Sequence, residues 1–311
     1  MSLPDGVRIR EIAPRLTFQD HVVPTAIKIE LVQRLVDAGV RAFELSSFVR
    51  ADLVPGLADA AEVFAQVPRV PGLSLGCCVG NRHGLGRAVD AGADTAYFLL
   101  SADEEFARAN IGRSTADSLR ELERMHAYAA DQDVMLGTYI IFAWGGPIAP
   151  ARTGEDLEPL ARRLLDIGVD HWILADSSGY AAPPHMRELV TAALAHVPSA
   201  NLTVQIHDDR GMGLAALLPL LELGIHAIDT SLAGSGGHPA MPGTQGGGLC
   251  TEDAVQLLEL CGVDTGIDLP RLIETANWLT GEVGVPGKGF VRHTGPVPSA
   301  GQPSTPLTFT W

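Results

Sequence analysis

The chain has 311 residues, a net charge of −15 and a pI near 5.0. This acidic balance argues against nucleic acid as a partner, because nucleic-acid binding needs clustered Lys and Arg, and it gives no support to attraction by acidic membranes. Apolar residues make up 46% of the chain and aromatic residues only 5%, which predicts an aliphatic core. No apolar run reaches the roughly 20 residues that a membrane-spanning helix requires. We therefore expect a soluble protein, and the acidic balance does not exclude an anionic small molecule as a ligand.

The cysteines and the amino terminus indicate a cytoplasmic protein. None of the four cysteines (Cys77, Cys78, Cys250 and Cys261) has a partner at metal-ligand spacing. A core of this size needs no disulfide, so we expect reduced thiols. The first residues lack the basic region and apolar stretch of a signal peptide.

Short β-rich runs alternate with helical patterns along the chain. The predicted strands are residues 7–12, 42–47, 73–79, 95–100, 134–142, 171–176, 202–207 and 227–232. The predicted helices are residues 25–38, 114–130, 156–167 and 212–223. Gly39, Gly168 and Gly224 follow three of these helices, where glycine commonly ends a helix.

Eight strands that alternate with helices over about 230 residues predict an α/β (β/α)8 TIM barrel. The competing fold is a doubly wound sheet. That fold favours a glycine-rich turn after its first strand, where this chain has Ala13-Pro14-Arg15-Leu16. We predict a single catalytic domain over residues 1–285. Four prolines among the last 18 residues predict that the tail, residues 286–311, is extended or disordered.

A glycine-rich segment, residues 233–248, follows the eighth strand and contains His238. Such a segment can bring its backbone close to a ligand. A flexible linker is the alternative, but the helix predicted over residues 251–260 follows with too little sequence for a second domain. We therefore predict a lid over the mouth of the barrel.

Polar side chains stand where the predicted strands end, which is where TIM barrels carry their active sites. Arg15 follows the first strand, Glu44 and Ser46 lie at the second, and Asp176 and Ser177 end the sixth. Charged groups rarely enter a core unpaired, so their convergence at one mouth predicts a site. A structural salt bridge between Arg15 and Glu44, and a turn-capping role for Asp176, remain open.

Gln205 and His207 lie two residues apart at the end of the seventh strand, so they share one face. This spacing presents two ligands to one metal or substrate, but only one of the two is a histidine. A histidine that is hydrogen-bonded within the fold is the alternative for His207.

Several segments together resemble 3-hydroxy-3-methylglutaryl-CoA lyases, in consistent order from about residue 7 to residue 280. They are Arg15, Glu44-Leu45-Ser46-Ser47-Phe48, Asp176-Ser177-Ser178-Gly179, His207-Asp208-Asp209-Arg210-Gly211, Ala233-Gly234-Ser235-Gly236-Gly237 and Thr251-Glu252-Asp253. The superfamily also includes isopropylmalate and homocitrate synthases and 4-hydroxy-2-oxovalerate aldolases. The resemblance implies the same barrel fold.

The resemblance also implies a divalent cation, Mg²⁺ or Mn²⁺, but this chain departs from the family's ligands. The family's Asp, first His and Asn ligands correspond to Leu16, Gln205 and Gly248, and only His207 is retained. Leucine and glycine offer no side-chain donor, and the loss of the Asp charge weakens the attraction for a cation. The family's lid cysteine corresponds to His238.

The resemblance implies carbon–carbon bond cleavage through an enolate, on an acyl-CoA, a related acyl thioester or a hydroxy acid. Three alternatives follow: a 3-hydroxy-3-methylglutaryl-CoA lyase, a metal-independent relative with an altered substrate, and a non-catalytic binding protein on the same barrel. The predicted catalytic residues are Arg15, Glu44, Asp176 and His238. The predicted substrate contacts are Gln19, Ser46, Ser177 and Gln205, and the resemblance also suggests a homodimer.

Overall fold

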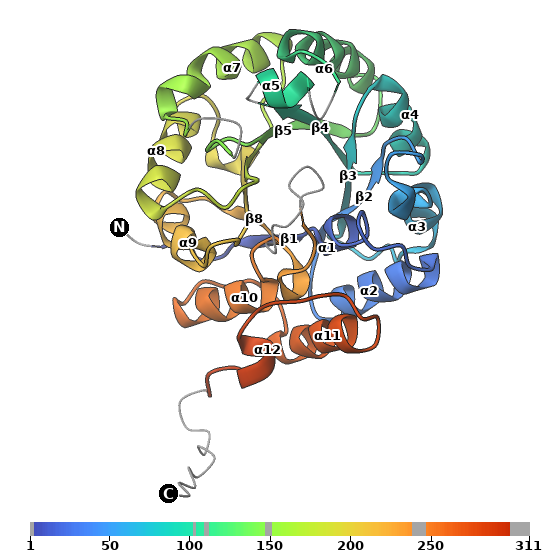
Figure 1. The fold of residues 1–311 in the computed structure, drawn as a ribbon, viewed down its shortest axis with the longest axis vertical. Helices are drawn as coiled ribbons and strands as arrows, with labels where there is room; N and C mark the ends of the chain where they lie inside the picture. Colours follow the sequence, from blue (N-terminus) through green and yellow to red (C-terminus); the bar gives the residue numbers. More distant parts are fainter. Residues whose placement is uncertain (1–2, 102–103, 109–111, 147–150, 238–246, 299–311) are drawn as a thin grey trace, which may run out of the picture.

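The computed structural model describes residues 3–101, 104–108, 112–146, 151–237 and 247–298. Its eight parallel strands pair in sequence order, and β1 pairs with β8 to close the barrel (Figure 1). The TIM-barrel prediction is confirmed, and closure excludes the doubly wound sheet. The strands are β1 (Arg8–Glu11), β2 (Ala42–Phe48), β3 (Ser74–Val79), β4 (Thr95–Ser101), β5 (Met135–Ile141), β6 (Trp172–Asp176), β7 (Leu202–Ile206) and β8 (Ala227–Thr230).

Helices surround the barrel, and the last of them, α10 to α12, lie together between α9 and α2 (Figure 1). They are α1 (Ala13–Leu16), α2 (Thr25–Asp37), α3 (Ala60–Gln66), α4 (Arg82–Asp90), α5 (Glu104–Phe106), α6 (Thr115–Ala129), α7 (Gly154–Ile167), α8 (Pro183–Leu194), α9 (Gly213–Glu222), α10 (Thr251–Leu260), α11 (Leu269–Gly281) and α12 (Val291–Thr294). The five predicted helices are present as α2, α6, α7, α9 and α10. The helices α3, α4, α8 and α11 were not predicted. In α4, two internal glycines weaken the helical pattern, and its Asn81 cap accepts a hydrogen bond from the Gly84 amide. Within the described residues, no helix has the length and apolar character needed to span a bilayer.

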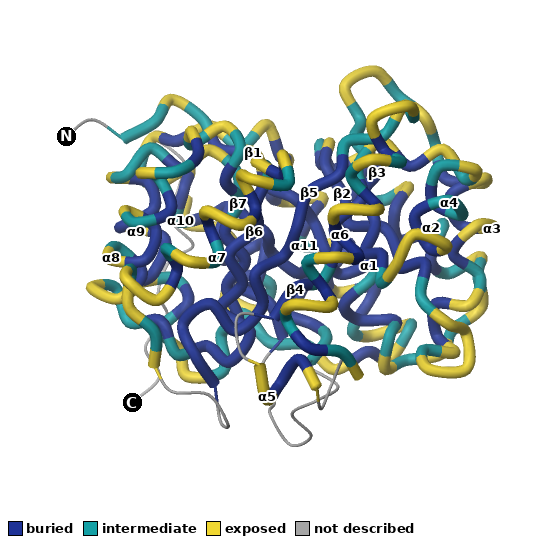
Figure 2. Tube along the Cα trace, turned by 90° about the horizontal axis from the view of Figure 1, so that it is seen from above, coloured by how far each residue is buried: buried dark blue, intermediate teal, exposed yellow. Residues whose placement is uncertain are grey.

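The strands separate two cores, and they are buried along most of their length (Figure 2). The larger core, aliphatic as predicted, lies between the outer faces of the strands and the helices. The smaller core fills the barrel and includes Tyr97, Tyr139, Ile173 and Ala175. Alternation along each strand decides which residues enter this interior. The barrel interior therefore contains aromatic side chains and, as described below, charged ones.

Of the tail predicted to be extended or disordered, residues 286–290 and 295–298 lie outside helices and strands, whereas Val291–Thr294 form α12. The α12 helix lies within this segment, and its first amides, of Phe290 and Val291, donate to the Asp253 carboxylate at 2.8–3.0 Å. The Lys288 amide also donates to the Ala233 carbonyl at 2.6 Å. The four prolines on which the prediction relied all follow α12, and the Asp253 carboxylate satisfies the first amides of this helix. Residues 299–311 lie outside the described part of the chain.

The Glu11 side chain at the end of β1 connects α1, the turn after β8 and α10. Its carboxylate accepts hydrogen bonds from the amides of Ala13 (2.8 Å) and Leu232 (3.0 Å) and from the Thr251 hydroxyl (2.7 Å). Burial raises the pKa of Glu11 from 4.5 to about 7, although these hydrogen bonds oppose the rise. The folded state therefore binds this proton more tightly than the unfolded chain does.

This raised pKa gives a pH-dependent stability. The stabilisation is complete below the unfolded pKa and is lost as the pH rises through about 7. We expect the unfolding free energy of the wild type to fall by about 2 kcal/mol relative to Glu11→Gln between about pH 5 and pH 8. Urea titrations of both proteins measure it, with the exposed Asp37→Asn as control. The prediction is contradicted if the unfolding free energies of wild type and Glu11→Gln change with pH in the same way.

Candidate functional site

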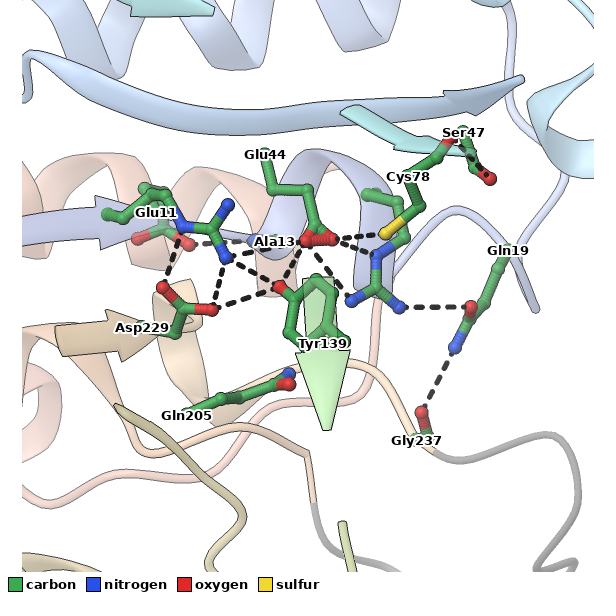
Figure 3. A network of polar contacts seen from close by, with 12 residues as sticks. Glu11, Ala13, Gln19, Glu44, Ser47, Cys78, Tyr139, Gln205, Asp229 and Gly237 are labelled. Carbon is green, nitrogen blue, oxygen red and sulfur yellow. Dashed lines mark hydrogen bonds and ion pairs between the residues drawn. The ribbon is translucent and has the colours of Figure 1, made fainter. Parts of the chain in front are cut away.

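The mouth of the barrel holds a buried ion pair between Arg15 and Glu44 (Figure 3). Pro14, which is favoured in the first turn of a helix, helps to start the short helix α1, and this helix presents Arg15 directly after β1. Arg15 Nε lies 2.7 Å from Glu44 Oε1, and Arg15 Nη2 lies 3.5 Å from Glu44 Oε2. The Glu44 side chain is fully buried, whereas Arg15 keeps 13% of its side chain exposed. Buried Glu44 thus fixes the Arg15 guanidinium, while part of the Arg15 side chain stays accessible to solvent.

A second ion pair lies deeper in the barrel. Arg10 and Asp229 are paired residues of β1 and β8, and Arg10 Nε donates to Asp229 Oδ1 at 2.7 Å. The Tyr139 hydroxyl joins the two pairs, because it contacts Glu44 and also lies 3.0 Å from Asp229 Oδ2 (Figure 3). The sequence analysis missed Arg10, Tyr139 and Asp229. A charged residue inside an apolar strand was the available signal for Arg10 and Asp229.

The buried charges balance, with two guanidinium groups facing two carboxylates. Burial by itself would raise the pKa of Glu44, but Arg15 and Arg10 outweigh it and lower this pKa. Glu44 therefore stays ionised at neutral pH. The Cys78 thiol, 3.0 Å from Glu44 Oε1, donates to the same carboxylate. Burial raises the pKa of Cys78, so this thiol stays protonated.

Gln19 connects Arg15 to the base of the predicted lid. Its side-chain oxygen accepts from Arg15 Nη1 at 3.4 Å, and its amide donates to the Gly237 carbonyl at 3.0 Å (Figure 3). The hydroxyls of Thr17 and Ser235 lie 2.6 Å apart nearby. The segment that begins the predicted lid is therefore attached to the residues that directly follow α1. His238 lies outside the described residues.

The four positions that correspond to family metal ligands come together in space. Gln205 and His207 share one face as predicted, and their Nε2 atoms lie 3.4 Å apart. His207 forms an isolated β-bridge with Gly248. A Cβ atom added at Gly248 would lie 2.9 Å from the Ser231 Cβ and 3.6 Å from Leu16 Cδ2.

These positions fit a divalent cation poorly. Leu16 occupies the space against Gly248 and Gly236 with an apolar side chain. A side chain at Gly248 would have to displace the backbone or Ser231, so no ligand can be accommodated there without rearrangement. In the described ranges, no group of three or more His, Cys, Asp or Glu residues is arranged to hold a metal.

Ser46 faces away from the barrel interior, contrary to the predicted substrate contact. A β-bulge between Glu44 and Ser46 shifts the register of β2, so Ser46 pairs with Cys77, a residue of the outer core. Ser47 pairs with Cys78 and takes the inner face instead. A bulge inserts one residue and reverses the alternation that the sequence pattern assumes.

Asp176 also lies on the outer face, because Ala175 before it belongs to the inner core. Its two carboxylate oxygens accept from the amides of Tyr180 (2.8 Å) and Ala181 (3.0 Å). Burial raises the pKa of Asp176 to about 6. The structure therefore supports the turn-capping alternative and does not bring Asp176 to the Arg15–Glu44 pair.

Ser177 holds the neighbouring loop. Its hydroxyl accepts from the amide of Phe142 at 3.2 Å, and Phe142 has a positive φ of 55°. Such a backbone is unfavourable for an aromatic residue, so this hydrogen bond supports a strained turn at the end of β5.

Comparison with known proteins adds to this geometry. The model of the HMGL-like family matches residues 17–279. The mitochondrial hydroxymethylglutaryl-CoA lyase of Rattus norvegicus is 34% identical over 284 residues, which cover 89% of this chain and 86% of the rat protein. The HMG-CoA lyase structure from Bacillus subtilis has a TM-score of 0.89 at 30% identity and covers 94% of this chain and 99% of its own. An HMG-CoA lyase of Acinetobacter baumannii, solved with coenzyme A and 3-methylmalate, has a TM-score of 0.91 at 28% identity and covers 98% of each chain.

Proposed function

The chain belongs to the HMGL-like family, and on that premise we propose that it is a carbon–carbon lyase of the 3-hydroxy-3-methylglutaryl-CoA lyase type. Its substrate is an acyl-CoA or a related acyl thioester with a hydroxyl group at the third carbon, in keeping with the coenzyme A complex of the Acinetobacter relative. Within the site, the observation that carries the proposal is the Arg15 guanidinium, fixed by buried Glu44 at the mouth.

The reaction breaks a carbon–carbon bond next to the hydroxyl carbon. A base takes the hydroxyl proton, the carbonyl of one product forms, and the electron pair of the broken bond passes to the enolate of the acyl thioester. A proton then converts the enolate into the acyl-CoA product. The negative charge that develops on the thioester oxygen is the feature that the site must stabilise.

Arg15 fits this task because it is a permanent cation with several donors. We assign enolate stabilisation to Arg15 and the positioning of Arg15 to Glu44. Gln19 and Gln205 are the proposed substrate contacts, since the first touches Arg15 and the second faces the barrel interior. His238 stays the proposed acid/base group, because an unperturbed imidazole titrates close to neutral pH.

Asp176, Ser46 and Ser177 receive supporting parts in this proposal. Asp176 and Ser177 hold the loops after β6 and β5, and Ser46 belongs to the outer face of β2. A base role for Asp176 would require its carboxylate to leave two backbone amides.

Lyases of this type use a divalent cation, which supplies Lewis acidity toward the substrate's oxygen atoms when it is bound. Leu16 and Gly248 deprive this chain of two of the four ligand positions, and the neutral Gln205 replaces a third. We therefore propose that cleavage proceeds without a cation at those positions, on an altered substrate, with His207 serving as a substrate contact.

Chelation tests the metal-independent proposal. We expect the rate of acyl-CoA release from 3-hydroxy-3-methylglutaryl-CoA, or from a shorter or longer 3-hydroxyacyl-CoA, to be unchanged by EDTA. Elemental analysis of the purified protein is expected to show no stoichiometric Mg or Mn. A rate that falls with EDTA and returns with Mn²⁺ contradicts the proposal.

A restored-ligand variant is the matched control. Leu16→Asp combined with Gln205→His gives three donors together with His207, and calorimetric titration with Mn²⁺ is expected to show binding that the wild type lacks. The alternative of a non-catalytic barrel predicts instead that no acyl-CoA is cleaved by either protein.

The compartment and assembly also remain proposals. The four cysteines are free, which agrees with a reducing cytoplasm, and one rat relative is a cytoplasmic lyase. A homodimer stays a prediction, which sedimentation of the purified protein tests.

A further inference from the structure

The amino-terminal end of the barrel, opposite the mouth, contains a cavity of about 200 Å³. All eight strands contribute to its lining. The first positions of three strands carry small side chains, Ala42, Ser74 and Ala227, which cannot fill the space between the strands. The hollow therefore follows from residue size at this end of the barrel.

The lining of this cavity is positively charged on a protein whose net charge is −15. Arg8 and Arg10 both line it, and none of its lining residues is Asp or Glu. Three acids, Glu11, Asp94 and Asp170, are adjacent in sequence to lining residues, and each has other partners. Glu11 accepts from the Ala13 and Leu232 amides, Asp94 accepts from the Leu75 amide (2.7 Å), and Asp170 contacts His171 Nδ1 (3.0 Å) and the Asn201 amide (3.1 Å). The lining therefore carries two arginines and no carboxylate, although Asp229 pairs with Arg10 from inside the barrel.

The two arginines differ in their partners. Arg10 is buried and pairs with Asp229, yet its Nη1 atom has no hydrogen-bond partner among the described residues. Arg8 lies two residues earlier on the same face of β1, and its side chain is exposed. No carboxylate of the described ranges forms an ion pair with Arg8, so its charge is available to a ligand.

We propose that this cavity binds a small oxyanion, a phosphate or a carboxylate, with Arg8 as its principal contact. A planar guanidinium matches both groups with two parallel hydrogen bonds. The hydroxyl side chains of Ser74, Thr95 and Thr203 line the same space and are suited to the remaining oxygen atoms.

A bound anion also connects this end of the barrel to the mouth. Arg10 lines the cavity and contacts Tyr139, whose hydroxyl contacts Glu44, the partner of Arg15. An anion near Arg10 changes the field that this guanidinium exerts on Glu44. Linkage then requires that substrate binding at the mouth and anion binding at the opposite end affect each other. This coupling rests on the proposed function, whereas anion binding itself does not.

Calorimetric titration of the full chain with inorganic phosphate, and separately with acetate, tests the site. Chloride at matched ionic strength is the reference for non-specific effects. We expect saturable binding of phosphate or acetate, and the arm that binds identifies the class of anion. The proposal is overturned if the titrations with phosphate and with acetate both give the same heats as the chloride reference.

Three variants locate the binding. Arg8→Gln is expected to weaken the affinity about tenfold or more, because a charge-assisted hydrogen bond contributes roughly 1.5–3 kcal/mol. Arg34→Gln removes the same charge outside the cavity, where Arg34 pairs with Glu30 at 2.7 Å, and is expected to bind as the wild type does. Arg15→Gln is expected to keep the binding, since Arg15 lies at the other end of the barrel. The proposal is overturned if Arg8→Gln and Arg34→Gln lose the same affinity. It is also overturned if only Arg15→Gln loses affinity.

The titration needs no turnover, so its outcome is independent of the lyase proposal. A protein that binds phosphate through Arg8 but cleaves no acyl-CoA supports the anion site and contradicts the proposed function. A protein that is active but shows no binding does the reverse.

Discussion

Replacing Arg15 by glutamine is expected to lower kcat/KM for acyl-CoA release about 10²–10³-fold, the cost of losing one donor to a developing oxyanion. The physical reason is that glutamine keeps a hydrogen-bond donor but removes the permanent positive charge beside the enolate oxygen. Steady-state rates with the best 3-hydroxyacyl-CoA substrate measure the effect. The decrease is expected mainly in kcat, because the enolate charge exists only after the bond begins to break.

The controls separate this role from folding. Arg34 forms an exposed ion pair with Glu30 on α2, so Arg34→Gln removes the same charge far from the mouth and is expected to leave kcat/KM unchanged. Arg15→Gln with Glu44→Gln removes both charges of the buried pair and is expected to recover stability without recovering activity. Wild-type rates in a folded Arg15→Gln variant would remove Arg15 from the mechanism.

Replacing Arg10 by methionine is expected to lower the free energy of unfolding by about 3–5 kcal/mol. Asp229 is fully buried on β8, and its ion-pair partner is Arg10, the residue paired with it on β1. The variant leaves that carboxylate in a low-dielectric interior without its compensating charge. Urea unfolding followed by circular dichroism measures the loss.

A double variant shows whether the loss comes from the unpaired carboxylate. Arg10→Met combined with Asp229→Leu removes both charges and is expected to recover most of the lost stability. The matched surface variant Arg34→Met is expected to cost at most about 0.5 kcal/mol. A loss in Arg10→Met no larger than that of Arg34→Met would show that the buried pair adds nothing to stability.

The two variants are expected to differ in how they affect catalysis. Arg15 lies at the mouth of the barrel, where we propose that substrate binds, so its loss affects turnover directly. Arg10 acts on the mouth only through Tyr139 and Glu44. Arg10 is therefore a positioning residue whose loss lowers stability first.

The sequence by itself determined the barrel, because strand-length apolar runs and helix-ending glycines are local properties that survive without tertiary context. It also located Arg15 and Glu44 at the mouth, since the carboxyl ends of parallel strands in a barrel meet at one end. The substituted positions Leu16, Gln205 and Gly248 were readable as residue types, and the structure places them together with His207.

Only the tertiary structure decided which polar residues face one another. A single-residue bulge in β2 exchanged Ser46 for Ser47, and the alternation of β6 turned Asp176 toward its own loop. Arg10, Tyr139 and Asp229 come from strands far apart in the chain, so no local pattern could report their contacts. Pairing across a closed barrel depends on strand register, and register is set by the packing of the whole sheet.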